Sequence, residues 1–450
     1  MQTVNHPPSP MPRREEWLRP LPKQCWRSNA ILARALSIAA AALAMLAGCS
    51  VLLSEPIALA RNADKPVLAD RRSDMRALPR PDRRGAKLKR LPFSETAVEF
   101  ARVPGVSSAR FWADSMSDFE QALPQCPGPW LILSEGGEDG AYGAGVLAGW
   151  TKEGSRPEFS VVTGTSTGAL IAPYAFLGVD YDDRLYQQYT TVTAADIFEV
   201  GATSESMFDT WPLASLIAKN ITPELLRNIA KEHRRGRRLF VATTNLDAAR
   251  PVIWNMGAIA AYGGEAGLIL FRQILLASAS IPGLFPPVMI DVQADGRHFQ
   301  EMHADGGAAA PFYVAPESYL LGAANVRLPA SAIYIVVNGK LTPEFEVTDR
   351  TTVAILGRSI GVALKAAARA EIVAVRSVAR LQGIDVSVAA VDPSFAHETH
   401  GPFDRERMKA LFDIGFEQAR NRAAFRNEFE PGPASSLRLR DGALSNRSNP

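Results

Sequence analysis

Three short groups of residues in this 450-residue chain have the types and spacing that acyl-transfer chemistry requires. The most compact is Gly164-Thr165-Ser166-Thr167-Gly168, which follows a β-branched run and precedes a run of small residues. A serine between two such glycines can stand on a tight strand-to-helix turn that exposes its hydroxyl group. N–H groups at the start of the following helix would stabilise negative charge beside it. Ser166 is therefore a candidate nucleophile, with Gly164 and Gly168 as the glycines of its elbow.

The second group supplies a base for the serine. In Asp305-Gly306-Gly307 the two glycines allow a sharp turn, and the carboxylate could take the serine proton directly if burial raised its pKa. A second arrangement is a serine–aspartate–histidine triad, since Ser166, the aspartate and either His397 or His400 follow the chain order of α/β-hydrolases. Both histidines lie in a polar stretch, residues 394–402, that is typical of a surface loop. This favours the aspartate as the base.

The third group is a glycine-rich turn directly after an apolar run at residues 130–133. Gly136 and Gly137 could turn two backbone N–H groups towards a reacting carbonyl, and such donors stabilise the transition state by roughly 3–4 kcal/mol each. A dinucleotide-binding turn fits poorly because Gly143 and Gly145 fall inside the predicted helix. A phosphate-binding Walker loop is excluded because no Gly-Lys-Ser/Thr follows. An oxyanion hole is the interpretation that remains.

The elements around these residues form one βαβ unit. Strands are predicted at residues 130–134 and 159–165, with a helix between them, and a right-handed crossover makes the two strands parallel. The glycine turn and Ser166 then lie side by side at the carboxyl ends of parallel strands, where open α/β sheets keep their sites. Further strands are expected at 238–247 and 332–338, and long helices at 351–381 and 403–423.

Composition excludes several other classes of protein. The net charge is +2, and the excess of positive charge lies in the first 49 residues, so nucleic-acid binding has no support. If Cys25 is removed and Cys49 modified, as expected below, Cys126 is the one cysteine left and no disulfide can form within the chain. The six histidines show no metal-ligand spacing. We expect neither a metal nor a cofactor.

The amino-terminal region predicts a lipoprotein signal peptide at residues 1–48. An apolar run that ends at Ala47 is too short to span a bilayer but suits a signal peptide. It ends in Leu46-Ala47-Gly48-Cys49, which is similar to the lipobox of bacterial lipoproteins, so Cys49 is the predicted lipidation site. Acyl chains there would anchor the protein to a membrane of the bacterial cell envelope. Ser50 favours the outer over the inner membrane, with the protein facing the periplasm.

The rest of the chain divides into four segments. Residues 49–92 are rich in basic residues and proline, and we expect a solvated tether. Residues 93–126 carry several aromatic residues and are expected to pack onto the catalytic domain as an extension. That domain is predicted at 127–430. The last segment, 431–450, is rich in serine, proline, glycine and arginine and is predicted to be disordered.

The three groups together resemble the patatin-like phospholipase family, closely over residues 130–307 and more loosely to about residue 422. The family pattern is a glycine-rich oxyanion turn, Gly-x-Ser-x-Gly and a distant Asp-Gly followed by Gly or Ala, and all three occur here in that order. The segment 279–287, Ala-Ser-Ile-Pro-Gly-Leu-Phe-Pro-Pro, is a further match. One residue departs from the pattern, because Glu135 stands where family members usually have another glycine.

The resemblance implies a three-layer α/β/α fold with a mostly parallel central sheet and a Ser–Asp dyad. It also implies a lipid acyl hydrolase of the phospholipase A or esterase type, acting on a lipid or phospholipid without a cofactor. Ser166 would form the acyl-enzyme, Asp305 would act as base, and Gly136 and Gly137 would hold the oxyanion. Two alternatives stay open: a triad esterase that uses His397 or His400, and an envelope lipoprotein that keeps the fold for binding. The sequence names no protein partner.

Overall fold

The computed structural model describes residues 90–125, 127–201, 205–322, 326–345, 347–397 and 400–426. The predicted signal peptide at 1–48, the lipidation site Cys49, nearly all of the tether and the tail at 431–450 lie outside these ranges. Within them, no helix is both long enough and apolar enough to cross a membrane.

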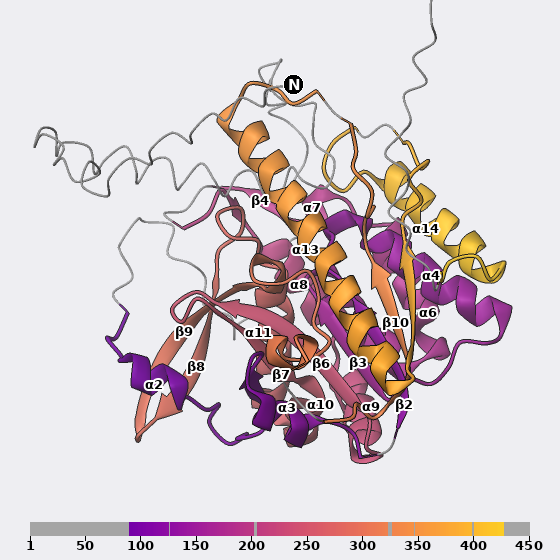
Figure 1. The fold of residues 1–450 in the computed structure, drawn as a ribbon. Coiled ribbons are helices and arrows are strands. Elements are labelled where there is room, and N and C mark those ends of the chain that lie inside the picture. The colour runs from indigo at the N-terminus through magenta and orange to yellow at the C-terminus, as the bar shows by residue number, and fades with distance from the viewer. Residues whose placement is uncertain are drawn as a thin grey trace, which may run out of the picture.

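The core of the molecule is a nine-stranded sheet in the order β1-β7-β6-β3-β2-β10-β11, with β9 pairing to β6 and β8 to β9 (Figure 1). The strands are β1 (Arg110–Trp112), β2 (Gly128–Leu133), β3 (Val161–Thr165), β6 (Arg238–Asn245), β7 (Arg250–Asn255), β8 (Val288–Ala294), β9 (Arg297–Asp305), β10 (Ala330–Val337) and β11 (Asp385–Ala390). The run from β6 to β11 is parallel, whereas β1, β7, β8 and β9 pair antiparallel. A separate two-stranded ribbon joins β4 (Glu199–Val200) to β5 (Phe208–Asp209).

Side chains alternate between two hydrophobic cores, one on each face of the sheet. In β2, Leu131 and Leu133 point into one core, and Trp130 and Ile132 point into the other. This period of two, with apolar residues on both faces, is what a strand buried between two helical layers requires. The larger core is covered by α4 (Gly140–Glu153), α5 (Thr167–Leu177), α6 (Asp182–Thr190), α8 (Trp211–Asn220), α9 (Pro223–Arg234), α10 (Met256–Tyr262), α11 (Gly264–Ser278) and α14 (Arg405–Arg420). The other is covered by α3 (Met116–Ala122), α12 (Glu317–Leu320) and α13 (Thr352–Gln382), the long helix in front of the sheet in Figure 1.

The expectation of a three-layer α/β/α fold with a mostly parallel centre is confirmed. The two long carboxy-terminal helices occur where expected, as α13 and α14. The antiparallel hairpin β8–β9 was not anticipated, although Asp295 and Gly296 have the positive φ of 49° and 72° that its two-residue turn requires. This hairpin ends at Asp305, so it sets the position of the candidate base.

Helix α14 lies unusually close to α4, the helix that follows the glycine turn. A Cβ atom on Gly145 would lie 2.0 Å from the carbonyl oxygen of Phe412, and one on Gly149 would lie 2.1 Å from that of Phe416. In return, a Cβ on Gly415 would lie 2.4 Å from the carbonyl oxygen of Tyr142. The two backbones can approach this closely because glycine has no side chain there. Gly145, one of the glycines that resembled a dinucleotide motif, thus serves helix packing.

Residues 93–125 add elements to one edge of the sheet. They form α2 (Glu95–Glu99), β1 and α3, and β1 pairs with β7. Arg110 of β1 forms a buried ion pair with Glu301 of β9, and both Glu301 and its neighbour His303 are 0% exposed. The extension is therefore part of the same folded unit as the hairpin that carries Asp305.

Candidate active site

Ser166 stands between the end of β3 and the start of α5, as the elbow interpretation requires. Its backbone has φ 55° and ψ −122°, a conformation that residues with side chains rarely adopt. The N–H group of Ser166 donates to Ser278 Oγ at 3.0 Å, and Ser278 Oγ donates in turn to the carbonyl oxygen of Ala242 at 2.7 Å. Ser278, at the end of α11, thus ties the strained turn to β6.

The two glycines of the elbow lie where no side chain would fit. A Cβ on Gly164 would be 2.4 Å from the carbonyl oxygen of Gly168. A Cβ on Gly168 would be 2.4 Å from the carbonyl oxygen of Leu133 and 2.6 Å from that of Ser134. Helix α5 therefore begins in direct contact with the end of β2, and β2 leads into the glycine turn. This contact brings the nucleophile and the turn together.

Asp305 ends β9 beside the serine. Its Oδ2 accepts a hydrogen bond from Ser166 Oγ at 2.7 Å, and its Oδ1 accepts one from the N–H group of Gly307 at 2.7 Å. A Cβ on Gly306 would lie 2.6 Å from the carbonyl oxygen of Ala242. The residue after the aspartate must therefore be glycine for the backbone to lie this close to β6. The structure thus brings together Ser166 and Asp305, which are 139 residues apart in the chain.

Burial prepares Asp305 to accept a proton near neutral pH. The residue is 3% exposed, and Ser166 is 6% exposed. Burial raises the pKa of Asp305 to about 7, although the hydrogen bonds from Ser166 and Gly307 favour the ionised form. A base with a pKa near the working pH is well matched to proton transfer.

The glycine turn follows β2, next to the elbow. Leu133 of β2 pairs with Gly164 of β3, so Gly136 and Gly137 lie beyond the sheet edge beside Ser166. Gly136 has φ 152° and Gly137 has φ 55°, and a Cβ on Gly136 would lie 2.0 Å from the carbonyl oxygen of Asn338. Among the described residues, no hydrogen bond takes up the N–H group of Gly136. That group remains available to an acyl oxygen.

Asn338 braces this turn from β10. Its side-chain Nδ2 donates to the carbonyl oxygen of Ser134 at 2.8 Å, and its backbone N–H donates to Ser134 Oγ at 2.9 Å. Sequence analysis gave Asn338 no role. Its place as the last residue of a predicted strand, in a sheet whose carboxyl edge holds the site, is the signal that could have identified it.

Glu135 adds a second carboxyl group to the site. A Cβ on Gly307 would lie 3.1 Å from Asp305 Oδ1 and 3.2 Å from Glu135 Cγ, so the two acidic side chains lie near each other beside Gly307. Burial, and then the charges of Asp305 and Asp139, raise the pKa of Glu135 to about 8. At neutral pH this carboxyl group is mostly protonated and adds little negative charge to the site.

An ion-pair cluster from α14 holds the far side of the glycine turn. Arg407 Nη1 lies 2.8 Å from Glu138 Oε1 and 2.6 Å from Asp139 Oδ1, both in the 3-10 helix η3 (Gly137–Asp139). The N–H group of Phe403 donates to the other oxygen of Glu138. Burial raises the pKa of Glu138 to about 7, and Arg407 acts in the opposite direction. Sequence analysis did not foresee this support, because Arg407 is more than 260 residues from the turn.

The two histidines of the triad alternative lie apart from the serine. His400 contacts Asp404, with Nδ1 3.3 Å from Oδ2, and His397 lines a separate cavity. No hydrogen bond between either ring and Ser166 or Asp305 occurs among the residues that the structure describes. The oxygen of Asp305 itself occupies the position that a histidine base would take.

A second buried network lies behind Asp305 on the same strand. His303 Nε2 is 3.2 Å from Glu301 Oε2, and its Nδ1 is 2.9 Å from Thr243 Oγ1. Burial lowers the pKa of His303. Burial alone would raise the pKa of Glu301, but its contacts with His303 and Arg110 outweigh burial, and the pKa of Glu301 is lowered. The network contains a neutral histidine and a paired carboxylate, and it fixes β9 against β6 and β1. Within the described ranges, no three His, Cys, Asp or Glu side chains gather as a metal site.

Comparison with known proteins identifies the central part of the chain. Residues 131–316 match the family model of the patatin-like phospholipases, so this chain contains a patatin-like phospholipase domain. Among solved structures, the crystal structure of VipD from Legionella pneumophila matches with a TM-score of 0.34 and 13% identity, over 66% of this chain and 67% of that one. No match was found among curated proteins. The matched segment includes the glycine turn, Ser166 and Asp305, but not Lys340 or Arg407.

Proposed function

We propose that this patatin-like phospholipase domain is a lipid acyl hydrolase of the phospholipase A or esterase type. Its nucleophile is Ser166, its base is Asp305, and its oxyanion donors are the N–H groups of Gly136 and Gly137. The observation that carries the proposal is the hydrogen bond of 2.7 Å between Ser166 Oγ and Asp305 Oδ2. A serine and a buried carboxylate in direct contact can transfer a proton without an intervening group.

In the acylation step, Asp305 takes the proton of Ser166 as Oγ attacks the ester carbonyl carbon. Negative charge then develops on the carbonyl oxygen, and the backbone N–H groups of the glycine turn stabilise it. The protonated aspartate returns its proton to the leaving alcohol as the ester bond breaks. Water, deprotonated by Asp305, then attacks the acyl-serine. The acyl–Oγ bond breaks, the fatty acid leaves, and Asp305 returns the proton to Ser166 Oγ.

The experiment is hydrolysis of a panel of lipid esters and of p-nitrophenyl butyrate by the purified protein. We expect Ser166→Ala to lower kcat by roughly a thousandfold or more, and Asp305→Asn by roughly a hundred- to ten-thousandfold. Replacing both His397 and His400 by alanine should leave kcat within about twofold. Full activity in Ser166→Ala would refute the proposal, and a loss in the histidine variant alone would favour the triad.

A catalytically inactive binding protein is the second candidate, and Glu135 is the observation that favours it. The negative charge of an ionised Glu135 would destabilise the oxyanion. Its raised pKa of about 8 weakens this candidate, because the protonated form carries no charge. Labelling of Ser166 by a fluorophosphonate probe separates the two, since an inert serine is not labelled.

We also propose that the chain is a lipoprotein of the bacterial cell envelope, anchored through Cys49 to the outer membrane and facing the periplasm. The lipobox at residues 46–49 directly after an apolar run supports this. Mass spectrometry of the full-length protein from membranes should show diacylglycerol on Cys49. A soluble Cys49→Ala variant is the matched control, and an unmodified Cys49 on membrane-bound protein would refute the proposal.

A further inference from the structure

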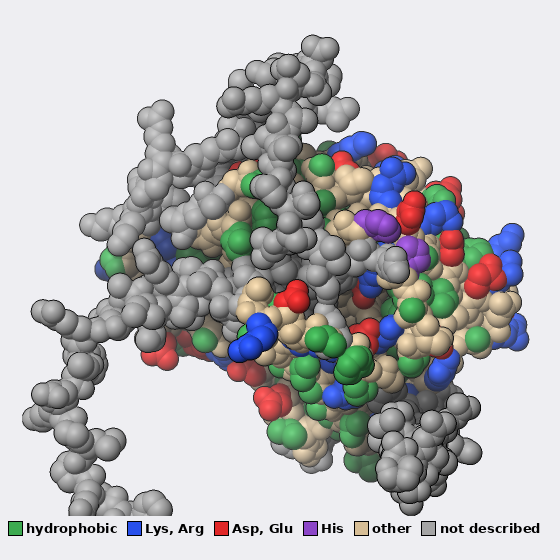
Figure 2. All heavy atoms as spheres, turned by 90° about the horizontal axis from the view of Figure 1, so that it is seen from above, with side chains coloured by type: hydrophobic (Ala, Val, Ile, Leu, Met, Phe, Trp, Pro, Cys, Tyr) green, Lys and Arg blue, Asp and Glu red, His purple; other side chains and the backbone are tan. Residues whose placement is uncertain are grey.

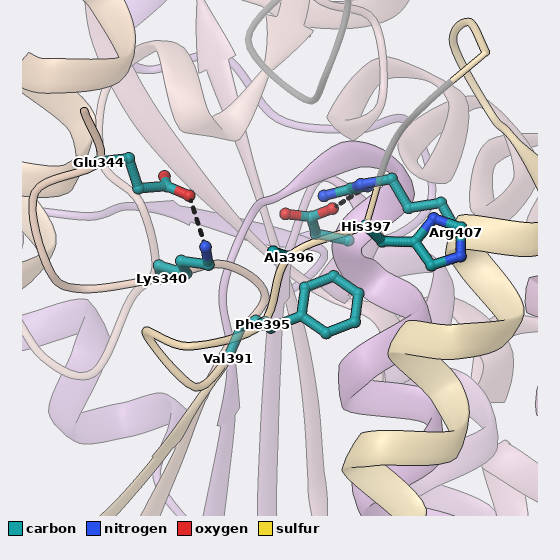
Figure 3. A pocket seen from close by; sticks show the side chains of 8 residues that line it. Lys340, Glu344, Val391, Phe395, Ala396, His397 and Arg407 are labelled. Atoms are coloured by element: carbon teal, nitrogen blue, oxygen red, sulfur yellow. Dashed lines mark ion pairs between the residues drawn. The ribbon is translucent and has the colours of Figure 1, made fainter. Parts of the chain in front are cut away.

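A polar cavity of about 560 Å³ opens beside the glycine turn, at the carboxyl ends of β10 and β11. Figure 3 shows charged side chains entering it from different elements, with Lys340 and Glu344 on one side and Arg407 and His397 on the other. The lining residues are Asp139, Lys340, Glu344, Val391, Phe395, Ala396, His397 and Arg407. Nothing in the dyad chemistry uses this space.

Charged side chains of both signs line the cavity, and Glu344 and Arg407 each have a further partner outside the lining, Lys365 and Glu138. Lys340 Nζ lies 3.0 Å from Glu344 Oε1, and Arg407 Nη1 lies 2.6 Å from Asp139 Oδ1. The Lys340–Glu344 pair is partly open to solvent, with side chains 17% and 40% exposed. Partly exposed pairs are weak, so a ligand that offers both charges can replace the Lys340–Glu344 contact. A ligand that carries only positive or only negative charge would instead be repelled by the lining side chains of the same charge.

The cavity shares the glycine turn with the dyad, because its wall includes Asp139 of η3. Asp139, on its wall, is two residues beyond Gly137, and its charge acts on Glu135, which lies near Asp305 beside Gly307. A molecule bound in the cavity would therefore lie against the same turn that supplies the proposed oxyanion donors. In a glycerophospholipid, the polar headgroup and the acyl esters are joined through one glycerol unit, so the two ends can occupy neighbouring sites.

We propose that this cavity binds the zwitterionic headgroup of a glycerophospholipid with a primary ammonium group. Lys340 and Arg407 would contact the phosphate, and Glu344 and Asp139 would accept hydrogen bonds from the ammonium group. A quaternary ammonium has no N–H to donate, and a headgroup with phosphate alone leaves both carboxylates opposed. This proposal rests on the proposed lipid acyl hydrolase function and names its preferred substrate class.

The surroundings of the cavity agree with a lipid ligand. Phe345 follows the lining residue Glu344 and is 96% exposed, and Val347 in the same loop is 81% exposed. Apolar side chains held in solvent beside a polar cavity can enter the acyl region of a lipid surface while the headgroup stays in the cavity. Figure 2 shows acidic and basic side chains interspersed where side chains are visible on this face, without a broad field of one sign.

The test compares phosphatidylethanolamine, phosphatidylcholine, phosphatidylglycerol and diacylglycerol with identical acyl chains in the same mixed micelles. We expect phosphatidylethanolamine to be hydrolysed about tenfold faster than the others in kcat/KM. Lys340→Gln and Glu344→Gln should each remove most of that preference, mainly through KM, and leave p-nitrophenyl butyrate hydrolysis unchanged. Lys409→Gln, which loses an exposed pair with Asp413 on α14, is the matched control. Equal rates on all four lipids, or a preference that survives in both variants, would overturn the proposal.

A second measurement separates this proposal from the dyad mechanism. The Ser166→Ala protein, which should not turn over, is titrated with sn-glycero-3-phosphoethanolamine and with sn-glycerol 3-phosphate. Saturable binding of the first, at least about fivefold tighter than the second and lost in Lys340→Gln, supports the headgroup site even if no ester is hydrolysed. Equal binding of the two compounds would identify a simple phosphate site and overturn the proposal. Ester hydrolysis that persists in Ser166→Ala would instead refute the proposed function.

Discussion

Replacing Glu135 by glutamine should change the pH dependence of hydrolysis on its alkaline side. Activity in the wild type should rise as Asp305 ionises, because the base must be unprotonated to take the serine proton. Its pKa is raised to about 7. Activity should then fall again as Glu135, with a pKa of about 8, gains a negative charge beside the developing oxyanion. We therefore expect a narrow bell-shaped profile in the wild type and a plateau above pH 8 in Glu135→Gln.

The size of the effect follows from the distance between the two carboxyl groups. Asp305 Oδ1 and Glu135 Cγ lie 3.1 Å and 3.2 Å from the same point above Gly307. The groups are thus within roughly 6 Å, where two unit charges in a protein interact by about 3 kcal/mol. That coupling makes the pair ionise in two steps with apparent pKa values that belong to the pair. A charge at a similar distance from the oxyanion would lower the rate by roughly 30- to 100-fold.

The assay is kcat/KM for p-nitrophenyl butyrate between pH 5 and 10, with Ser166→Ala subtracted as background. Glu135→Gln should match the wild type below pH 7, because a protonated glutamate and a glutamine are both uncharged. It should exceed the wild type by tenfold or more at about pH 9.5. A fall of kcat/KM above pH 8 that persists in Glu135→Gln, or a wild type with no such fall, would refute this role of Glu135. Circular dichroism at each pH controls for unfolding.

Three further substitutions test the framework of the site. Gly136→Ala places a Cβ 2.0 Å from a carbonyl oxygen and should lower kcat by roughly 10²–10³-fold, whereas Gly201→Ala meets nothing within 4 Å and should be silent in the same ester assay. Asp305→Asn should raise the melting temperature at pH 8 by several degrees. Burial raises the pKa of Asp305, so ionisation of this carboxyl group destabilises the folded state as pH rises from about 4 to 7. An unchanged melting temperature would contradict that burial. Arg110→Met leaves the buried Glu301 without its cationic partner, with only His303 in contact, and should reduce the free energy of unfolding by about 3–5 kcal/mol. The double change with Glu301→Leu should recover most of that loss in a urea titration. Equal stability of the single and double variants would show that the unpaired charge is not the cause.

The nucleophile elbow was predictable because its constraints are local. A β-branched strand, two glycines and a small-residue helix act within a dozen residues, and Ser166 has the positive φ that such a turn imposes. The two faces of β2 were likewise predictable, since unbroken apolar runs belong to strands covered on both sides. The hairpin of β8 and β9 left a local signal as well, in the Asp295-Gly296 turn.

The parts that sequence analysis missed depend on contacts between distant segments. Ser278 holds the elbow through a hydrogen bond across 112 residues, and Arg407 reaches Glu138 across 269. Neither residue lies in a motif, because the geometry that selects it is made by two packed elements rather than by one. The cavity beside η3 is of the same kind, since its walls come from the glycine turn, from the loops that follow β10 and β11, and from α14.

The sequence by itself determined the chemistry that the site can perform: a serine on an elbow, a distant aspartate and a turn of bare N–H groups. Residue type and local spacing are enough for this, because backbone conformation at glycine and the reactivity of side chains are local properties. Only the tertiary structure decided that Asp305 rather than a histidine meets Ser166, and that its pKa is raised to about 7. Those facts depend on which side chains exclude water from the carboxylate, and desolvation is a property of the packed molecule.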